Sequence, residues 1–196
     1  MKIAILLPYK ENFSSEYPGA VSLFVNDTSQ ISRYKKNIIV FGNTKYKNKF
    51  KIKYININLS SNPLASQTKA YVNRFINLQK KFNFSIIEVH NRPSYINQLN
   101  KKLSNTVLSL YFHNDPLSMD GSKTVEDRKK LLKNCYKIIF NSNWSKKRFL
   151  EGLENKFVNS HKLLIIYQSA KKNNLSIIKH KKKWITFVGK LNKAKG

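Results

Sequence analysis

Two of the four histidines in this 196-residue chain have matching neighbours: an asparagine follows each histidine directly, and a proline lies three residues after the histidine. The two segments are His90-Asn91-Arg92-Pro93 and His113-Asn114-Asp115-Pro116. Imidazole exchanges a proton near neutral pH, and the neighbouring amide, guanidinium and carboxylate groups give or accept hydrogen bonds. Such a set is suited to a polar binding cleft.

Both segments directly follow apolar runs, 84–89 and 106–112, which the pattern predicts to be buried strands. Ligands of open parallel sheets bind beyond the carboxyl ends of the strands, so we expect His90 and His113 to share one cleft. The competing interpretation is that each is a structural residue at a strand end. Neither the carboxylates nor the imidazoles have the close spacing of metal ligands, and we expect no metal.

Two further candidates also follow predicted strands. Ser142 lies in Asn141-Ser142-Asn143, after the strand 136–140, where a small polar residue can equally be a helix cap. Gly19 lies in the loop between the first strand, 2–7, and a helix, where backbone N–H groups can meet a phosphate or simply form a turn. The motifs G-x-G-x-x-G and G-x-x-x-x-G-K-[ST] are absent from the sequence, which argues against a dinucleotide cofactor and against a P-loop ATPase.

The elements that must position these residues alternate along the chain. Apolar strand-like runs are followed by segments with helical spacing, and near-continuous apolar strands are typical of a parallel sheet covered on both faces. We therefore predict an α/β fold with a Rossmann-like, doubly wound parallel sheet. The run 51–57 alternates polar and apolar residues and is predicted to be an edge strand. The predicted strands are 2–7, 37–41, 51–57, 84–89, 106–112, 136–140 and 162–167.

The formal net charge is +27 and the sequence pI is about 10.2. Arginine is scarce beside lysine, and the lysines are spread over every segment, so we expect no specific nucleic-acid partner. Such a surface is still attracted to anionic partners, including a membrane with acidic headgroups. The single cysteine, Cys135, fits a reducing compartment, and the amino-terminal residues lack the pattern of a signal peptide, so we expect a cytoplasmic location.

The end of the chain indicates more than one domain. We predict one α/β domain over 1–167, a basic linker over 168–183, and the first strand and loop of a second domain over 184–196. The last segment runs from Trp184 through an apolar stretch to Gly189 and a basic loop, as expected where a new α/β domain begins. We therefore expect the chain to contain one half of a two-domain protein.

The order of these motifs resembles glycosyltransferase family 4, whose members are retaining enzymes with the GT-B fold. The resemblance rests on the two His-Asn segments, on 138–144, and on Phe187-Val188-Gly189-Lys190-Leu191 with Lys195-Gly196, which is similar to the family's F-V-G-R-L…K-G segment. It implies that Gly19, Lys190 and Lys195 face the donor diphosphate and that His113 contacts the transferred sugar. Lys190 stands where arginine is usual in the family.

By this resemblance the chain is the amino-terminal, acceptor-side half of a GT-B enzyme that uses a nucleotide-diphosphate sugar and no other cofactor. The implied acceptor is a glycan or lipid-linked saccharide of the lipopolysaccharide type, and the implied location is the inner face of the cytoplasmic membrane. The cleft residues are His90, Asn91, Arg92, Asn114, Asp115 and Ser142. The family's carboxylate motif would lie beyond Gly196, so we expect this chain alone to be inactive. Two alternatives are a basic module that binds polyanions or nucleic acid, and a non-catalytic GT-B-like subunit.

Overall fold

The computed structural model describes residues 1–59 and 66–168 of the chain. Seven strands form one sheet in the order β3-β2-β1-β4-β5-β6-β7, and every neighbouring pair is parallel. The predicted parallel α/β fold is confirmed. The strands are β1 (Ile3–Leu6), β2 (Ile38–Gly42), β3 (Tyr54–Asn56), β4 (Ile86–His90), β5 (Val107–Phe112), β6 (Lys137–Phe140) and β7 (Leu163–Ile165).

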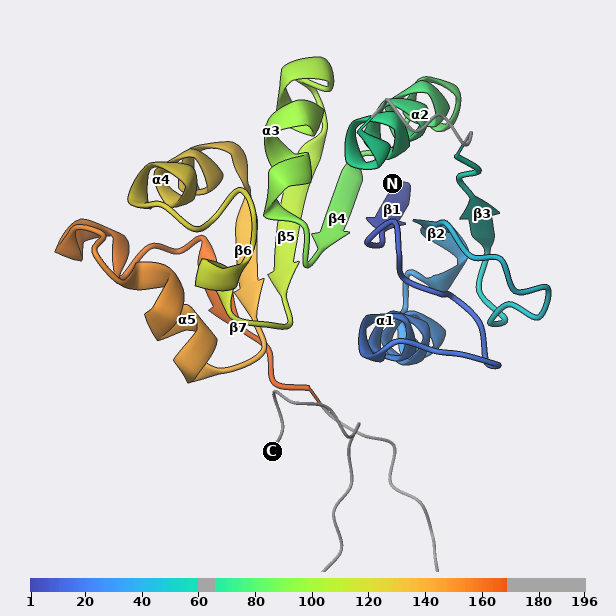
Figure 1. Ribbon diagram of the computed structural model, residues 1–196, viewed down its shortest axis with the longest axis horizontal. Helices are drawn as coiled ribbons and strands as arrows, with labels where there is room; N and C mark the ends of the chain where they lie inside the picture. The colour runs from blue at the N-terminus through green and yellow to red at the C-terminus, as the bar shows by residue number, and fades with distance from the viewer. Residues whose placement is uncertain (60–65, 169–196) are drawn as a thin grey trace, which may run out of the picture.

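The helices cover the sheet unequally. Figure 1 shows α2, α3 and α4 above the sheet and α1 below it. The larger core cluster packs α2 to α5 against one face, and the smaller cluster packs Val21 and Val25 of α1 against β1 and β2 on the other. The helices are α1 (Ala20–Ile31), α2 (Gln67–Phe82), α3 (Pro93–Lys102), α4 (Val125–Asn134) and α5 (Asn143–Leu150), with short 3-10 turns η1 (Lys35–Asn37), η2 (Pro116–Ser118) and η3 (Asn155–Phe157).

Helix starts follow from local chemistry. The Ser66 hydroxyl accepts a hydrogen bond from the Lys69 N–H at the start of α2. Thr124 and Asp127 form a reciprocal capping box at the start of α4. Pro93 occupies the first turn of α3, where a missing N–H costs nothing.

The two outermost strands are shorter than predicted. The runs 51–57 and 162–167 contribute only β3 and β7, three residues each, and β3 lies at the sheet edge as predicted. An outermost strand is paired on one side only, so fewer ladder hydrogen bonds hold its ends in extended conformation.

The strand order reverses between β1 and β4. The chain goes outward from β1 to β2 and β3, then returns to place β4 on the other side of β1. The connections that leave β1 and β4 therefore diverge, and in open α/β sheets such a reversal, at the carboxyl ends of the strands, is the usual position of a ligand crevice. His90 is the last residue of β4, so it lies at the point where the strand order reverses. Of the helices in the described ranges, none is long and apolar enough to cross a bilayer.

Candidate functional site

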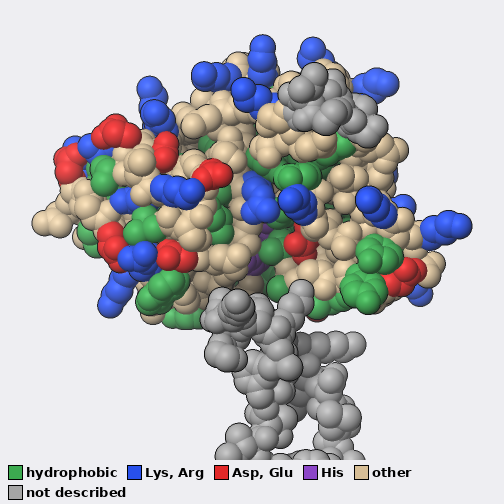
Figure 2. All heavy atoms as spheres, viewed as in Figure 1, with side chains coloured by type: hydrophobic (Ala, Val, Ile, Leu, Met, Phe, Trp, Pro, Cys, Tyr) green, Lys and Arg blue, Asp and Glu red, His purple; other side chains and the backbone are tan. Residues whose placement is uncertain are grey.

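The structure brings the two predicted histidines into direct contact. The Nδ1 atom of His90 lies 2.8 Å from the Nε2 atom of His113, which is the first residue after β5. The parallel register of β4 and β5 pairs His90 with Tyr111. The two strands therefore end side by side, which brings His90 and His113 together. His90 is fully buried, and His113 is partly exposed. In Figure 2 histidine surface is visible as a small recessed area near the middle of the view.

An acidic residue that sequence reasoning missed completes the arrangement. Glu88, two residues before His90 on the same face of β4, places its Oε1 2.7 Å from His90 Nε2. Alternation along a strand puts residues i and i+2 on one face, so the spacing Glu-x-His was a usable signal. At the other end, Gln168 Nε2 lies 2.7 Å from His113 Nδ1. Glu88, His90 and His113 thus form a continuous row of hydrogen-bonding side chains, the imidazole chain.

Aromatic rings hold the imidazole chain in place. The Tyr111 ring stacks on both imidazoles, 5.5 Å from His90 and 4.4 Å from His113 between centroids. Phe24 of α1 meets the His113 ring edge-on at 5.0 Å. The Tyr111 hydroxyl donates to the Ile166 carbonyl oxygen at 2.8 Å. Burial, with a smaller contribution from Glu88, raises the pKa of Tyr111 to about 12, so this hydroxyl remains a donor.

These surroundings keep His113 uncharged at neutral pH. Burial, with a smaller contribution from the neighbouring His90, lowers the pKa of His113 from 6.5 to about 3. A neutral imidazole has one N–H and one lone pair, so each ring nitrogen has a distinct function. His113 can therefore either accept or donate one hydrogen bond on its open side, depending on which nitrogen carries the proton.

The predicted cleft residue Asn91 joins the two strands beneath the histidines. Its backbone is in the left-handed region, φ 49°, which asparagine tolerates better than most residues. Its Oδ1 accepts a hydrogen bond from the His113 N–H at 2.7 Å, and its own N–H donates to the Tyr111 carbonyl at 2.9 Å. Arg92 Nη1 donates to the Asn91 carbonyl oxygen at 2.7 Å. Asn91 is buried, and its hydrogen bond to the His113 N–H holds the start of the loop after β5 in place.

The other predicted cleft residues mostly make contacts within the protein. Asp115 accepts from the Leu117 N–H at 3.0 Å and forms an ion pair with Arg148 of α5 at 3.2 Å. Ser142 caps α5 by accepting from the Ser145 N–H at 3.1 Å, which confirms the capping interpretation. Asn114 is exposed. A role of these three side chains toward a ligand remains a prediction.

The amino terminus of α1, where Gly19 was expected to meet a phosphate, holds a carboxylate of the protein itself. Glu11 Oε1 accepts the Ser22 N–H at 2.9 Å. A Cβ placed on Gly19 would lie only 2.0 Å from that oxygen. The glycine thus makes room for Glu11, and an anionic ligand at this helix end would have to displace it. The helix end that Gly19 suggested for a ligand is thus occupied by Glu11, whose negative charge matches the helix dipole.

Some of the predicted site residues and segments lie outside the part of the chain that the structure describes. Lys190, Lys195, the segment 184–196 and all of the linker 168–183 except Gln168 lie outside the described residues. In the described ranges, no three histidine, cysteine, aspartate or glutamate side chains gather in a way that could hold a metal ion. Cys135 is buried, and burial raises the pKa of its thiol to about 12, so it is a packing residue.

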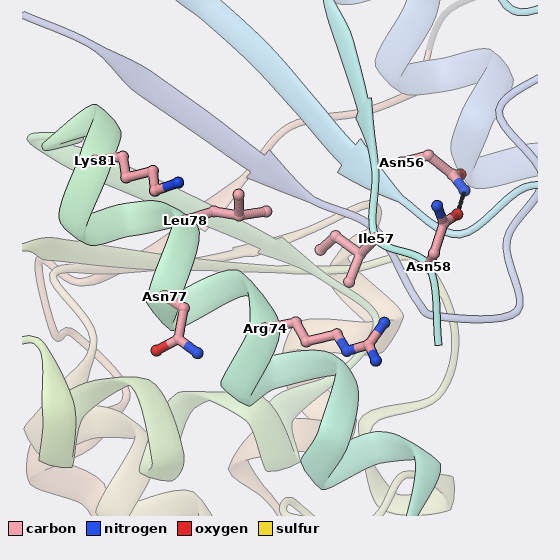
Figure 3. A pocket seen from close by; sticks show the side chains of 7 residues that line it. All are labelled: Asn56, Ile57, Asn58, Arg74, Asn77, Leu78 and Lys81. Atoms are coloured by element: carbon pink, nitrogen blue, oxygen red, sulfur yellow. Dashed lines mark hydrogen bonds between the residues drawn. The ribbon is translucent and has the colours of Figure 1, made fainter. Parts of the chain in front are cut away.

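A separate open pocket of about 290 Å³ lies at the edge of the sheet, between the end of β3 and α2 (Figure 3). It shares no residue with the imidazole chain. Two cations, Arg74 and Lys81, lie on its α2 side, and both are exposed. The lining residues are Asn56, Ile57, Asn58, Arg74, Asn77, Leu78 and Lys81.

Comparison with known proteins shows similarity at the level of structure. The sequence matches no family model and no curated protein. Among solved structures, HepE from Anabaena in complex with UDP-glucose superposes with a TM-score of 0.55 at 15% identity, over 85% of this chain. A glycosyltransferase from Rickettsia africae gives 0.53 at 19% identity over 85% of this chain. A UDP-N-acetylglucosamine 2-epimerase from Rickettsia bellii gives 0.51 at 10% identity over 84%.

The chain spans less than half the length of these proteins: the matched parts are 44%, 43% and 44% of their chains, respectively. The similarity covers the seven-stranded parallel sheet and its helices. The chain therefore has the Rossmann-like α/β fold of one half of a GT-B protein.

Proposed function

We propose that the chain is the acceptor-side domain of a retaining glycosyltransferase, which transfers a sugar from a nucleotide-diphosphate sugar to a surface glycan of the lipopolysaccharide type. The observation that supports this most is the neutral His113, held by His90 and Asn91 at the carboxyl end of β5. The fold supports it further, because HepE, which shares it, was crystallised with UDP-glucose.

The chemistry of glycosyl transfer fits this arrangement. The reaction needs a donor placed against an acceptor hydroxyl, exclusion of water, and stabilisation of the departing diphosphate. A rigid, uncharged imidazole at the crevice can hydrogen-bond a sugar hydroxyl without adding charge near the reacting carbon. Lys190 and Lys195 would neutralise the diphosphate, each as a point charge rather than with the two-pronged geometry of arginine.

The proposed organisation has two domains. Residues 1–167 form the acceptor-side domain, 168–183 the linker, and 184–196 the beginning of the donor-binding domain. Because the remaining donor contacts would come from that second domain, the chain by itself is expected not to turn over. Its net charge of +27 favours a peripheral position on an anionic membrane surface in the cytoplasm.

A deletion and rescue experiment tests this function. Deleting the gene of the whole two-domain protein should remove a sugar from the surface glycan, as measured by mass spectrometry of purified glycans, and the full-length wild-type gene should restore it. A gene with His113→Ala should restore about a hundredfold less of the sugar, in line with the loss of one positioned polar group. His161→Ala, which changes an exposed histidine in the turn before β7, is the matched control and should rescue fully.

The product distinguishes the proposed reaction from its neighbours. A retaining transferase gives a glycoside with the anomeric configuration of the donor, which NMR of the purified glycan reveals. Inversion of that configuration would contradict the retaining mechanism but keep the transferase. An unchanged glycan together with an epimerised nucleotide sugar would favour the chemistry of the 2-epimerase and overturn the proposal.

A further inference from the structure

Glu88 is the part of the site that the proposed function leaves without a task. The chain has only 10 acidic residues against 37 basic ones, and this one lies in a strand between apolar neighbours. Its side chain is 30% exposed, and no lysine or arginine pairs with it among the described residues. Its close polar contact is with the fully buried His90, at 2.7 Å.

The contacts determine where each imidazole carries its proton. An ionised carboxylate only accepts hydrogen bonds, so His90 must place its proton on Nε2, facing Glu88. A neutral His90 then has a lone pair on Nδ1, which can only accept. The partner of that lone pair, His113 Nε2 at 2.8 Å, must therefore carry the proton of His113. The remaining nitrogen of His113, Nδ1, is left with a lone pair.

The opposite end of the imidazole chain agrees with this assignment. The group 2.7 Å from His113 Nδ1 is the amide nitrogen of Gln168, which is a donor. If His90 carried two protons, His113 would accept at Nε2 and hold its own proton on Nδ1, facing that donor. Two donors would then point at each other.

We propose that Glu88 is a positioning residue: acting through His90, it fixes the proton of His113 on Nε2. The Nδ1 lone pair is then left on the side of the ring that faces Gln168, where it can accept a hydrogen bond from a sugar hydroxyl. That the hydroxyl belongs to a sugar rests on the proposed function. The direction of the hydrogen bonds along the imidazole chain does not depend on that function. A carboxylate that fixes one nitrogen of an imidazole decides what the other can do.

Gln168 marks the place that the hydroxyl takes. It is exposed, so its amide can be exchanged for a ligand group at little cost. A hydroxyl can donate as the amide does, whereas an ionised phosphate oxygen has no proton to give and would meet the lone pair of Nδ1 with repulsion. The site at His113 is thus selective for the sugar part of a substrate over its phosphates.

Nitrogen-15 NMR of the histidine rings, recorded on this chain without any ligand, tests the inference directly. In the wild type we expect a pyrrole-like Nε2 and a pyridine-like Nδ1 at His113, and a pyrrole-like Nε2 with a pyridine-like Nδ1 at His90. A His113 with its proton on Nδ1 would overturn the proposal.

Substitutions separate positioning from mere packing. Glu88→Gln keeps the shape, but an amide both donates and accepts, so both directions of the imidazole chain become available. We expect the ring nitrogens of His90 and His113 to shift toward intermediate values. Glu88→Asp retains a carboxylate and should keep the wild-type pattern. Glu126→Gln removes an equally negative but exposed charge on α4 and is the matched control. Dispersed amide signals confirm that each variant is folded.

The outcomes remain distinguishable from those of the proposed function. If Glu88→Gln leaves both rings unchanged, or if Glu126→Gln shifts them equally, Glu88 does not position His113, whatever the protein catalyses. If the rings shift as expected, the rescue assay follows: Glu88→Gln should restore about tenfold less sugar than Glu88→Asp. Equal rescue by both would show that the fixed direction does not serve transfer, and would overturn that part of the inference.

Discussion

The contacts that orient His113 also contribute to the free energy of unfolding. Its Nε2 is paired with the buried His90, and its ring stacks on Tyr111. Removing the imidazole would leave a nitrogen of His90 buried without a partner. A residue with these contacts contributes both to a binding site and to stability, so a loss of activity on substitution must be compared with the loss of stability.

We expect His113→Ala to lower the free energy of unfolding by about 1–3 kcal/mol, the cost of an orphaned buried polar group. Urea denaturation followed by circular dichroism measures it. Asn114→Ala, at the exposed neighbouring position, should stay within about 0.5 kcal/mol. If both variants were equally stable, His90 would have found another partner, and the contact between the imidazoles would be energetically unimportant.

The low pKa of His113 predicts a specific dependence of stability on pH. In the unfolded chain the ring protonates near its ordinary pKa of 6.5, whereas in the folded protein it stays neutral down to about 3. Between these values the unfolded state binds more protons, so stability falls as the pH falls, by up to about 1.4 kcal/mol per pH unit. Above pH 6.5 this contribution is constant.

The variant His113→Gln should therefore lose less stability than the wild type when the pH is lowered from 7 to 5, a range above most carboxylate titrations. Urea midpoints at several pH values give the two slopes. The exposed His161, changed to Gln, serves as the control and should keep the wild-type slope. Parallel slopes for wild type and His113→Gln would show that the ring is charged as easily in the folded protein as in the unfolded chain.

At the scale of elements, α1 makes the least expected contact. Its amino terminus is capped from outside the helix by Glu11, and its Phe24 reaches the imidazole chain. The same helix thus connects the crevice at β1 with the histidines beyond β4 and β5. Displacement of Glu11 by an anionic ligand would act on a helix that touches His113.

A double-mutant cycle tests the contact between Gly19 and Glu11. In the wild type, Gly19→Ala would push the carboxylate off the Ser22 N–H and cost about 1 kcal/mol, the usual value of a lost helix cap. In a Glu11→Ala background the added methyl group meets no carboxylate, and the same substitution should be nearly neutral. Urea titration of the four proteins gives the coupling energy. Additive effects would mean that Glu11 does not cap α1 in solution.

One continuous sheet joins all the described strands. Its centre is formed by β1, β4 and β5, and the imidazole chain lies at the carboxyl ends of β4 and β5. The helices α2 to α5 share one core cluster on one face, so their packing is not divided into separate units. Stability and site geometry should therefore be lost together.

We expect the chain to unfold as a single cooperative monomer. Circular dichroism in the far and near ultraviolet should report coincident thermal transitions, because the strands and the helices that cover them depend on the same core. Sedimentation before heating checks the monomer. Two separated transitions, or a broad one, would show that part of the sheet folds independently.

We also expect the chain alone to bind UDP or GDP no more tightly than millimolar, because the proposed diphosphate contacts lie in 184–196 and beyond. Isothermal titration calorimetry measures this, with HepE, which was crystallised with UDP, as the positive control. Saturable micromolar binding would place donor recognition in the described domain and contradict the proposed division of labour between two domains.

Local patterns in the sequence determined the class of fold and the helix starts. Apolar runs predict buried strands because a strand covered on both faces needs apolar residues throughout, and Thr124, Ser66 and Pro93 mark helix starts because their contacts lie within one turn. The sequence also predicted that His90 and His113 lie together at the carboxyl ends of the strands, since parallel strands end on the same side of a sheet.

What these residues touch depends on how the separate elements pack. The bond from His113 to Gln168 joins positions 55 apart, and the ion pair from Asp115 to Arg148 joins positions 33 apart. Glu11 filled the helix end that Gly19 alone had suggested for a phosphate. Periodicity fixes which face a side chain occupies, but contacts across separate elements depend on register, rotamer and burial, which are set when the whole core packs.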